Sequence, residues 1–353
     1  MKTKQTILCG FLALIFTLTF AACPDDNNGD NDKGETPPAG ISVPGSTLAE
    51  KLAWVLLPAN VTNGETYVIT VGADVSINPF TFSYTNRSNI TIILLGSGAK
   101  RIISLSSNGN LFRVGNSVTL VLDNNITLQG RNDNNNPVVN VLIGGTLEMR
   151  DGAKITGNIT STGSAGGVFI NATSSTFTMN GGEISGNTAT NGGGVNNNGT
   201  FTMNGGVISG NTASGSISAS KGGGVLNDRT FTMNGGVISD NTADIGGGVL
   251  NNSGTFTMNG GTISGNSATG SSSDGGGVYN AGTFRIVNGT IYGSNETNVS
   301  LKNNAATSGA ALYVHNSATQ TQRGTFSGTM WTSKGTFSTT SNTIKVVNGD
   351  LAQ

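Results

Sequence analysis

Charged side chains that could carry acid–base or metal chemistry are sparse in the middle of this chain. Hydrolysis of a glycosidic bond needs a pair of carboxylates, and a calcium site needs several oxygen ligands in one place. Between Phe177 and Ile291 the sequence has only eight charged residues: Glu183, Lys221, Asp228, Arg229, Asp240, Asp244, Asp274 and Arg285. This supply favours a protein that is not an enzyme, so we predict no catalytic residue, no cofactor and no metal. A carbohydrate-cleaving enzyme remains an alternative, which clustering of Asp228, Asp240, Asp244 and Asp274 would favour and scattering would weaken.

Histidine and basic residues narrow the function further. His315 is the only histidine, which excludes a His-based triad or a multi-His metal site, and we expect it on the surface. The chain has 18 basic and 19 acidic residues, with no basic cluster. Nucleic acid is therefore not an expected partner.

The segment that holds these few charged residues consists of a repeated sequence. The phrase TFTMNGGxISxN occurs four times, at Thr176–Asn187, Thr200–Asn211, Thr230–Asn241 and Thr255–Asn266, and decays at Thr283–Ser294. A second phrase, rich in glycine and ending in valine, separates the copies. The phenylalanines stand at positions 177, 201, 231, 256 and 284, which gives spacings of 24, 30, 25 and 28 residues. Such a period indicates a solenoid.

The pattern within a copy selects the type of solenoid. Phe201 and Met203 alternate with Thr200 and Thr202, as in a strand with one buried face. Each copy supplies three short strands, GGVx, TFTM and xIS, separated by Gly and Asn turns. Three strands per turn predict an all-β, right-handed parallel β-helix. This is the pectin-lyase-like fold of pectate lyases and polygalacturonases, and fold alone does not carry their activity over.

Stacked coils should place equal residues in columns. We expect columns of Val, Phe, Met and Ile inside, because no single coil can bury its own inner face. Two sets of asparagines should form ladders, one after the methionines and one after the Ile-Ser pairs. The expected ladders are Asn180, Asn204, Asn234 and Asn259, and Asn187, Asn211, Asn241 and Asn266.

The domain boundaries follow from composition. Residues 1–22 have a charged start and an apolar run typical of a signal peptide, and residues 23–45 are an acidic, Pro/Gly-rich tether without apolar periodicity. Residues 46–62 contain an amphipathic helix, with Leu48, Leu52, Val55 and Leu56 on one side, that should cap the solenoid. About ten coils should fill residues 63–350, with Trp331–Val347 closing the other end.

The end of the signal segment suggests an anchor. Phe20-Ala21-Ala22-Cys23 resembles the lipobox of bacterial lipoproteins, although leucine is usual in place of Phe20. The resemblance implies cleavage before Cys23 and lipid attachment to it, so a membrane is an expected partner. An ordinary secretory signal is the alternative. Cys9 is the only other cysteine, so the body of the protein has none.

Two surface features could bind a partner. The linkers that precede the glycine phrase, Thr188–Asn191, Thr212–Lys221, Thr242–Ile245 and Ser267–Asp274, vary between 4 and 10 residues, whereas the next valine-to-phenylalanine spacing is 6 or 7. Insertions at one corner of a solenoid commonly form its binding face. The candidate binding residues are Thr212, Ser214, Ser216, Ser218, Lys221, Ser267, Thr269, Ser271 and Asp274. The outward Thr-x-Thr pairs resemble an ice-binding face, but Arg285 breaks the fifth pair.

Two family resemblances complete the interpretation. The paired glycine–valine and F-x-x-N motifs, as at Gly166–Val168 and Phe177–Asn180, resemble those of chlamydial polymorphic membrane proteins, which are β-helical surface adhesins. The fuller pattern resembles repeat lipoproteins of Treponema-type spirochaetes, and this second resemblance covers nearly all of the chain beyond the signal segment. Its motifs are KLAW (Lys51–Trp54), SINP (Ser76–Pro79), LVLDNNITLQG (Leu120–Gly130), TIYGSNE (Thr290–Glu296), GAALY (Gly309–Tyr313) and NTIKVVNG (Asn342–Gly349).

The resemblances imply a lipid-anchored, surface-exposed outer-membrane protein of a bacterial cell envelope. It would act as a non-catalytic adhesion or host-interaction module, with host surface proteins or glycans as partners. No C-terminal membrane barrel like that of the chlamydial proteins is expected, because the lipid would provide the anchor. The alternatives are a carbohydrate-binding or carbohydrate-cleaving protein and a structural spacer without a ligand.

Overall fold

The computed structural model describes residues 38–215, 221–270, 273–293, 304–306, 311–314, 320–327, 330–333, 344–347 and 350–351. The chain divides into two units at Pro38, and the second, Ala39–Gln353, holds the solenoid. The expected signal segment, Cys23 and His315 lie outside the described residues.

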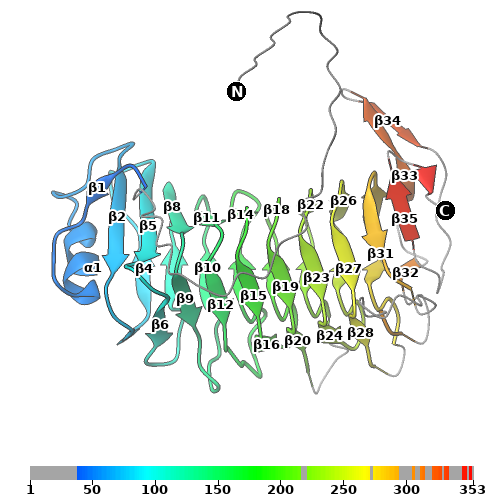
Figure 1. Ribbon diagram of the computed structural model, residues 1–353, viewed down its shortest axis with the longest axis horizontal. Coiled ribbons are helices and arrows are strands. Elements are labelled where there is room, and N and C mark those ends of the chain that lie inside the picture. Colours follow the sequence, from blue (N-terminus) through cyan, green and yellow to red (C-terminus); the bar gives the residue numbers. More distant parts are fainter. Residues whose placement is uncertain are drawn as a thin grey trace, which may run out of the picture. The chain divides into compact units, whose positions relative to one another are not determined.

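Parallel strands stack in long sheets, and each pass of the chain adds one strand to each sheet (Figure 1). Over the described residues the solenoid has about nine turns and one short helix, which confirms the predicted all-β parallel β-helix. We call the three long sheets A, B and C, and their strands are given below; going once around a coil, the chain passes through a strand of sheet C, then sheet A, then sheet B. In four coils a fourth, two-residue strand follows before the chain returns to sheet C.

Sheet A holds the TFTM segments. Its strands are β1 (Ile41–Ser42), β2 (Thr66–Val71), β5 (Ile90–Gly96), β8 (Val118–Leu122), β11 (Thr146–Met149), β14 (Thr176–Met179), β18 (Thr200–Met203), β22 (Thr230–Met233), β26 (Thr255–Met258), β30 (Thr283–Ile286), β33 (Gln320–Ser327) and β34 (Met330–Ser333).

Sheet B holds the xIS segments. Its strands are β3 (Val75–Ile77), β6 (Arg101–Leu105), β9 (Ile126–Gln129), β12 (Lys154–Thr156), β15 (Glu183–Ser185), β19 (Val207–Ser209), β23 (Val237–Ser239), β27 (Thr262–Ser264), β31 (Gly289–Ile291), β35 (Ile344–Val347) and β36 (Asp350–Leu351).

Sheet C holds the segments that follow the glycines. Its strands are β4 (Phe80–Phe82), β7 (Phe112–Val114), β10 (Val139–Val141), β13 (Val168–Ile170), β17 (Val195–Asn197), β21 (Val225–Asn227), β25 (Val249–Asn251), β29 (Val278–Asn280) and β32 (Leu312–Val314).

A short fourth sheet was not predicted. It consists of Thr-Ala or Ser-Ala pairs, β16 (Thr188–Ala189), β20 (Thr212–Ala213), β24 (Thr242–Ala243) and β28 (Ser267–Ala268). Two residues are too few to show an alternating pattern, so the sequence presents them as the start of a linker. The alanines face inward and are buried.

The predicted columns are confirmed by the strand registers. Phe201 pairs with Phe177 and Phe231, and the rings stack with centroids 4.8 and 4.7 Å apart. An isolated pair of rings would avoid a face-to-face arrangement. Here the spacing of neighbouring strands, about 4.8 Å, imposes it. The Val, Met and Ile columns are equally buried.

Glycine permits the close approach of successive coils beside sheet C. A Cβ atom on Gly224 would lie 2.6 Å from the carbonyl oxygen of Gly248 and 3.0 Å from the Nδ2 atom of Asn241. Gly222 has a φ of +66°, which L side chains rarely adopt. The glycine run therefore serves both a left-handed turn and a tight contact between coils.

Buried asparagines form two ladders along the solenoid. The first was predicted in part: it runs through Asn134, Asn158, Asn187, Asn211, Asn241, Asn266 and Asn304. The second was not predicted: Nδ2 groups donate to the next Oδ1 from Asn197 through Asn227 and Asn251 to Asn280, at 2.6–2.7 Å. Each ladder satisfies amides that would be costly to bury alone.

The capping helix α1 spans Leu48–Leu56 and packs against β2 (Figure 1). Thr47 accepts a hydrogen bond from the Glu50 amide at 3.2 Å, and the Glu50 carboxylate accepts from the amides of Ser46 and Thr47. These bonds form a capping box. Both backbone amides hold the pKa of Glu50 below its ordinary value.

One residue of the predicted apolar face was placed wrongly. Leu48, Leu52 and Val55 are buried, whereas Leu56 at the last position of the helix is 38% exposed. Helical spacing puts Leu56 beside Leu52, but at the end of the helix its side chain is left partly exposed.

At the C-terminal end the stacking pattern changes. β35 pairs antiparallel with β31, and β34 pairs antiparallel with β33. Antiparallel pairing ends the coil-by-coil addition of parallel strands. Of the segment expected to close the solenoid, Trp331–Val347, only residues 331–333 and 344–347 are described, so its closing role stays a prediction.

Candidate ligand-binding surface

The four candidate carboxylates lie at three different corners of the coil. Asp228 follows sheet C and Asp240 follows sheet B, whereas Asp244 and Asp274 stand between the short sheet and sheet C. Within the described residues, no three His, Cys, Asp or Glu side chains are grouped closely enough to hold a metal ion. The scatter weakens the enzyme alternative on the criterion set from the sequence.

The variable linkers do stack on one side, here called the loop corner. Thr212 pairs with Thr242, and Thr242 pairs with Ser267, so both long linkers leave from the same short sheet. The ends of successive linkers are also joined, because the amide of Gly222 donates to the carbonyl of Ile245 at 3.1 Å and the amide of Gly246 donates to the carbonyl of Asp274 at 3.0 Å. Lys221 bridges to the linkers before and after its own. The predicted convergence of these linkers is confirmed.

The individual candidate residues differ in exposure. Ser214 and Thr269 are exposed, and Thr212, Lys221, Ser267 and Asp274 are half-buried. Ser216, Ser218 and Ser271 lie outside the described residues. The Thr269 hydroxyl donates to the carbonyl of Ala243, which holds the start of the last linker against the coil before it.

Aromatic side chains near the loop corner were missed. Tyr279 and Tyr313 occupy the outward position of β29 and β32, and their rings stack 5.1 Å apart. Burial raises the pKa of Tyr279 to about 12, and the neighbouring Tyr313 and Asp274 add to the effect. The sequence places Tyr279 five residues beyond Asp274, and only the return of the chain through the glycines brings them together.

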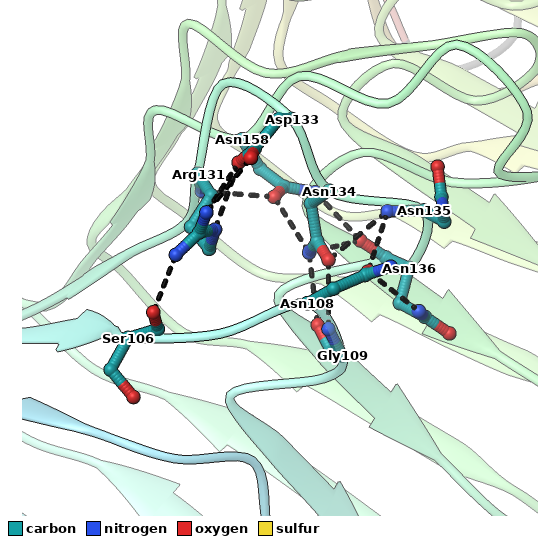
Figure 2. Close-up of polar contacts among 9 residues, drawn as sticks. All are labelled: Ser106, Asn108, Gly109, Arg131, Asp133, Asn134, Asn135, Asn136 and Asn158. Atoms are coloured by element: carbon teal, nitrogen blue, oxygen red, sulfur yellow. Dashed lines mark hydrogen bonds and ion pairs between the residues drawn. The ribbon is translucent and has the colours of Figure 1, made fainter.

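The N-terminal part of the loop corner is a polar network (Figure 2). The buried Asn134 amide donates to the carbonyl of Gly109 and to Oδ1 of Asn158, at 2.9 and 3.0 Å. Arg131 pairs with Asp133 at 2.8 Å and donates to the carbonyl of Ser106. These side chains are occupied with one another, so we assign the network to loop structure.

A groove lies at the opposite end of the sheet C strands, where they turn into sheet A. We call this side the turn corner. It has an open volume of about 560 Å³ lined by Asn171, Ala172, Thr173, Asn198, Asp228, Arg229 and Ser253. The lining comes from four successive coils, so the groove runs along the solenoid axis for about 14 Å at the usual strand spacing.

Unequal turn lengths create this groove. Five residues, Asn171–Ser175, join β13 to β14, and three, Asn252–Gly254, join β25 to β26. The two coils between them have two-residue turns, Asn198–Gly199 and Asp228–Arg229. The long turns form the walls and the short turns form the floor. Val168 and Phe177 are nine residues apart in the sequence, rather than 6 or 7, and this spacing could have revealed the groove.

The second asparagine ladder lies beneath the groove floor. Asn197 accepts a hydrogen bond from the Gly199 amide at 3.0 Å and donates to the carbonyl of Thr230 at 2.8 Å. Asn227 donates to the carbonyl of Arg229. The floor is therefore fixed by buried side chains before any ligand binds.

Opposite charges in the groove have different environments. The Asp228 carboxylate accepts from the Nδ2 group of Asn252 at 2.7 Å and from the hydroxyl of Ser253 at 3.3 Å. Among the described residues, the exposed Arg229 guanidinium has no hydrogen-bond or ion-pair partner. Arg229 is thus the group best placed to meet a ligand.

The outward face of sheet A carries the predicted Thr-x-Thr pairs. In β18, for example, Thr200 and Thr202 alternate with fully buried Phe201 and Met203. Beside them runs an exposed ladder in which Asn204 donates to Asn180, and each further asparagine donates to the one before it, all at 2.8 Å. Towards the N-terminus the face becomes aliphatic, with Val68, Ile93 and Val121. The regular threonine surface therefore covers only part of the sheet.

Neither the family models nor the curated proteins nor the solved structures provide a match to this chain. The described residues contain no helix with the length and apolarity that a bilayer crossing requires. The chain is thus characterised by its own geometry: a parallel β-helix with a variable loop corner on one side and a polar groove at another corner.

Proposed function

We propose that this protein is a lipid-tethered β-helix of a bacterial cell envelope that works as a non-catalytic binding module at the cell surface. The observation that carries the proposal is the distribution of variation and charge. Coils repeat the same inward residues, whereas turn length and polar chemistry differ at the corners. Binding proteins built from repeats place their variable loops in this way.

The charges support binding more than catalysis. A hydrolase needs two carboxylates at a fixed separation across one bond. Asp240 and Asp228 stand at different corners, and Asp228 is engaged by Asn252. Asp244 and Asp274 share the loop corner, so they are the one pair among the four candidates that the enzyme alternative could still use.

The anchoring part of the proposal rests on the sequence. Cys23 at the end of the signal-like segment would carry the lipid, and residues 24–45 would connect it to the capping helix. The partners would be host surface proteins or glycans, as the resemblance to β-helical adhesins implies.

Protease shaving of intact cells tests the proposal. We expect an added protease to remove the β-helix while a periplasmic control protein survives. Protection of the β-helix until the envelope is broken would contradict surface exposure and leave a periplasmic spacer. Because tightly stacked coils resist proteases, a protease site inserted beside Ser214 would make cleavage readable by size.

A further inference from the structure

We propose that the groove at the turn corner binds an acidic saccharide, with Arg229 receiving the carboxylate of the sugar. This inference deepens the proposed function, on which it rests, by naming the partner class. It uses the end of the sheet C strands opposite to the loop corner, from which the variable linkers leave.

The lining of the groove selects a saccharide. Its walls and floor present hydroxyl, amide and charged groups, and Ala172 is the only apolar residue among them. Hydroxyl-rich ligands fit such a surface, because each hydroxyl can both donate and accept. A peptide that added a strand would need a free sheet edge. β17 and β21 are already paired on both sides, so the groove floor offers none.

The charge of Arg229 selects an acid. A guanidinium presents a planar set of donors that matches a carboxylate with two parallel hydrogen bonds. Arg229 is exposed and has no such partner within the described chain. Asp228 is the one carboxylate in the lining, and it accepts hydrogen bonds from Asn252 and Ser253 in the turn that forms one wall of the groove. A ligand carboxylate can therefore reach Arg229.

The geometry of the floor favours binding without rearrangement. Gly199 and Arg229 are both held by ladder asparagines, at 3.0 and 3.3 Å. The backbone of each short turn is also bonded to the next coil, as in the bond from the Thr255 amide to the carbonyl of Arg229 at 2.6 Å. Little conformational entropy is lost when such a surface meets its ligand.

Calorimetric titration of the purified full-length protein tests the proposal. The probes are two matched pairs: sialyllactose with lactose, and a hyaluronan oligosaccharide with its carboxyl-reduced form. We expect binding of at least one acid and at least roughly tenfold weaker binding of its neutral partner. The two pairs distinguish a sialic acid from a uronic acid as the source of the carboxylate.

Variants locate the binding. Arg229→Ala should weaken binding of the acid by roughly tenfold or more, and Arg229→Lys should restore part of it because it keeps the charge without the planar donors. Arg113→Ala is the matched control, since Arg113 is exposed on β7 outside the groove. Thermal unfolding of each variant verifies that the fold is kept.

Each outcome has a defined meaning. Equal binding of acid and neutral forms, an equal loss in Arg113→Ala, or no binding of any probe overturns the inference. Displacement of a bound acid by an acidic peptide with higher affinity also overturns it in favour of a protein partner. If protease shaving shows surface exposure but no saccharide binds, only the saccharide site in the groove is rejected. If the saccharide binds but the protein is confined to the periplasm, only the proposed role at the cell surface is rejected.

Discussion

The Nδ2 group of Asn211 donates a hydrogen bond to the Oδ1 atom of Asn241 at 3.0 Å, and both side chains are fully buried. The backbone amide of Asn211 donates to the same oxygen at 2.9 Å. The side-chain oxygen of Asn241 thus accepts two hydrogen bonds from Asn211 in the preceding coil. The exposed ladder runs in the opposite direction, with Asn234 donating to Asn204.

Loss of one buried rung should therefore be costly. Asn211→Ala removes an acceptor from Asn187 and a donor from the carbonyl of Ile184. We expect it to lower the free energy of unfolding by about 2–4 kcal/mol. Asn204→Ala, in the exposed ladder, is the control and should cost less than about 1 kcal/mol. Chemical denaturation measures both, and equal effects would refute the importance of burial.

Crowding at the glycine run gives a second prediction. Gly224→Ala places a methyl group against the Gly248 carbonyl and should destabilise the protein by about 1–3 kcal/mol. Gly72→Ala is the matched control, because nothing lies within 4 Å of a Cβ atom at that position. The control should leave the melting temperature unchanged within about 2 °C. A stable Gly224→Ala protein would show that neighbouring coils can move apart.

The N-terminal cap should weaken in acid. The pKa of Glu50 is lowered by the amides of Ser46 and Thr47, so folding favours its charged form. The stabilisation is present above the ordinary value of 4.5 and is lost as the pH falls through the lower pKa of the folded state. The protection factors of the α1 amides, which correct for the intrinsic pH dependence of hydrogen exchange, should therefore fall in acid. Glu50→Gln should have lower protection factors at neutral pH, and these should change little as the pH falls. A variant whose protection factors follow the same pH profile as the parent protein would contradict this role.

The charge of Asp228 should oppose an acidic ligand in the groove. Asp228→Asn keeps an oxygen that can accept from Asn252 but removes the negative charge beside Arg229. We expect roughly two- to fivefold tighter binding of the acidic saccharide, and less difference at high salt. Titration at two salt concentrations measures it. Weaker binding by the variant would indicate that Asp228 contacts the ligand directly.

Lipid attachment is tested by the two cysteines. Cys23→Ser should abolish incorporation of labelled palmitate and release the protein from the membrane fraction. Cys9→Ser should retain both, since Cys9 lies within the segment that cleavage would remove. Label that persists in Cys23→Ser would overturn the assignment of the anchor.

The core was predictable because each buried position recurs in register. The alternation of Phe201 and Met203 with threonines predicts their buried columns, and the glycine-valine phrase predicts the strands of sheet C. Details that depend on a comparison between neighbouring coils were harder to see. The groove exists because the turn at Asn171–Ser175 is longer than the turn at Asn198–Gly199.

Side-chain direction explains the other omissions. Asn197 follows the same valine phrase as Ile170, which is apolar and equally buried, so the pattern does not reveal a polar ladder inside the solenoid. Leu56 has the helical spacing of a buried residue, yet it is partly exposed at the last position of the helix. The burial of these side chains depends on the tertiary structure around them, so local sequence periodicity does not predict it.

The register of the coils also bears on how this protein can change between generations. Recombination between two copies of the repeated phrase would delete or duplicate a whole coil. Asn180 would then meet Asn234 as it now meets Asn204, and Phe177 would meet Phe231 as it now meets Phe201. Descendants can thus differ in length by whole coils while the interior needs no new residues, and selection can act on the corners alone.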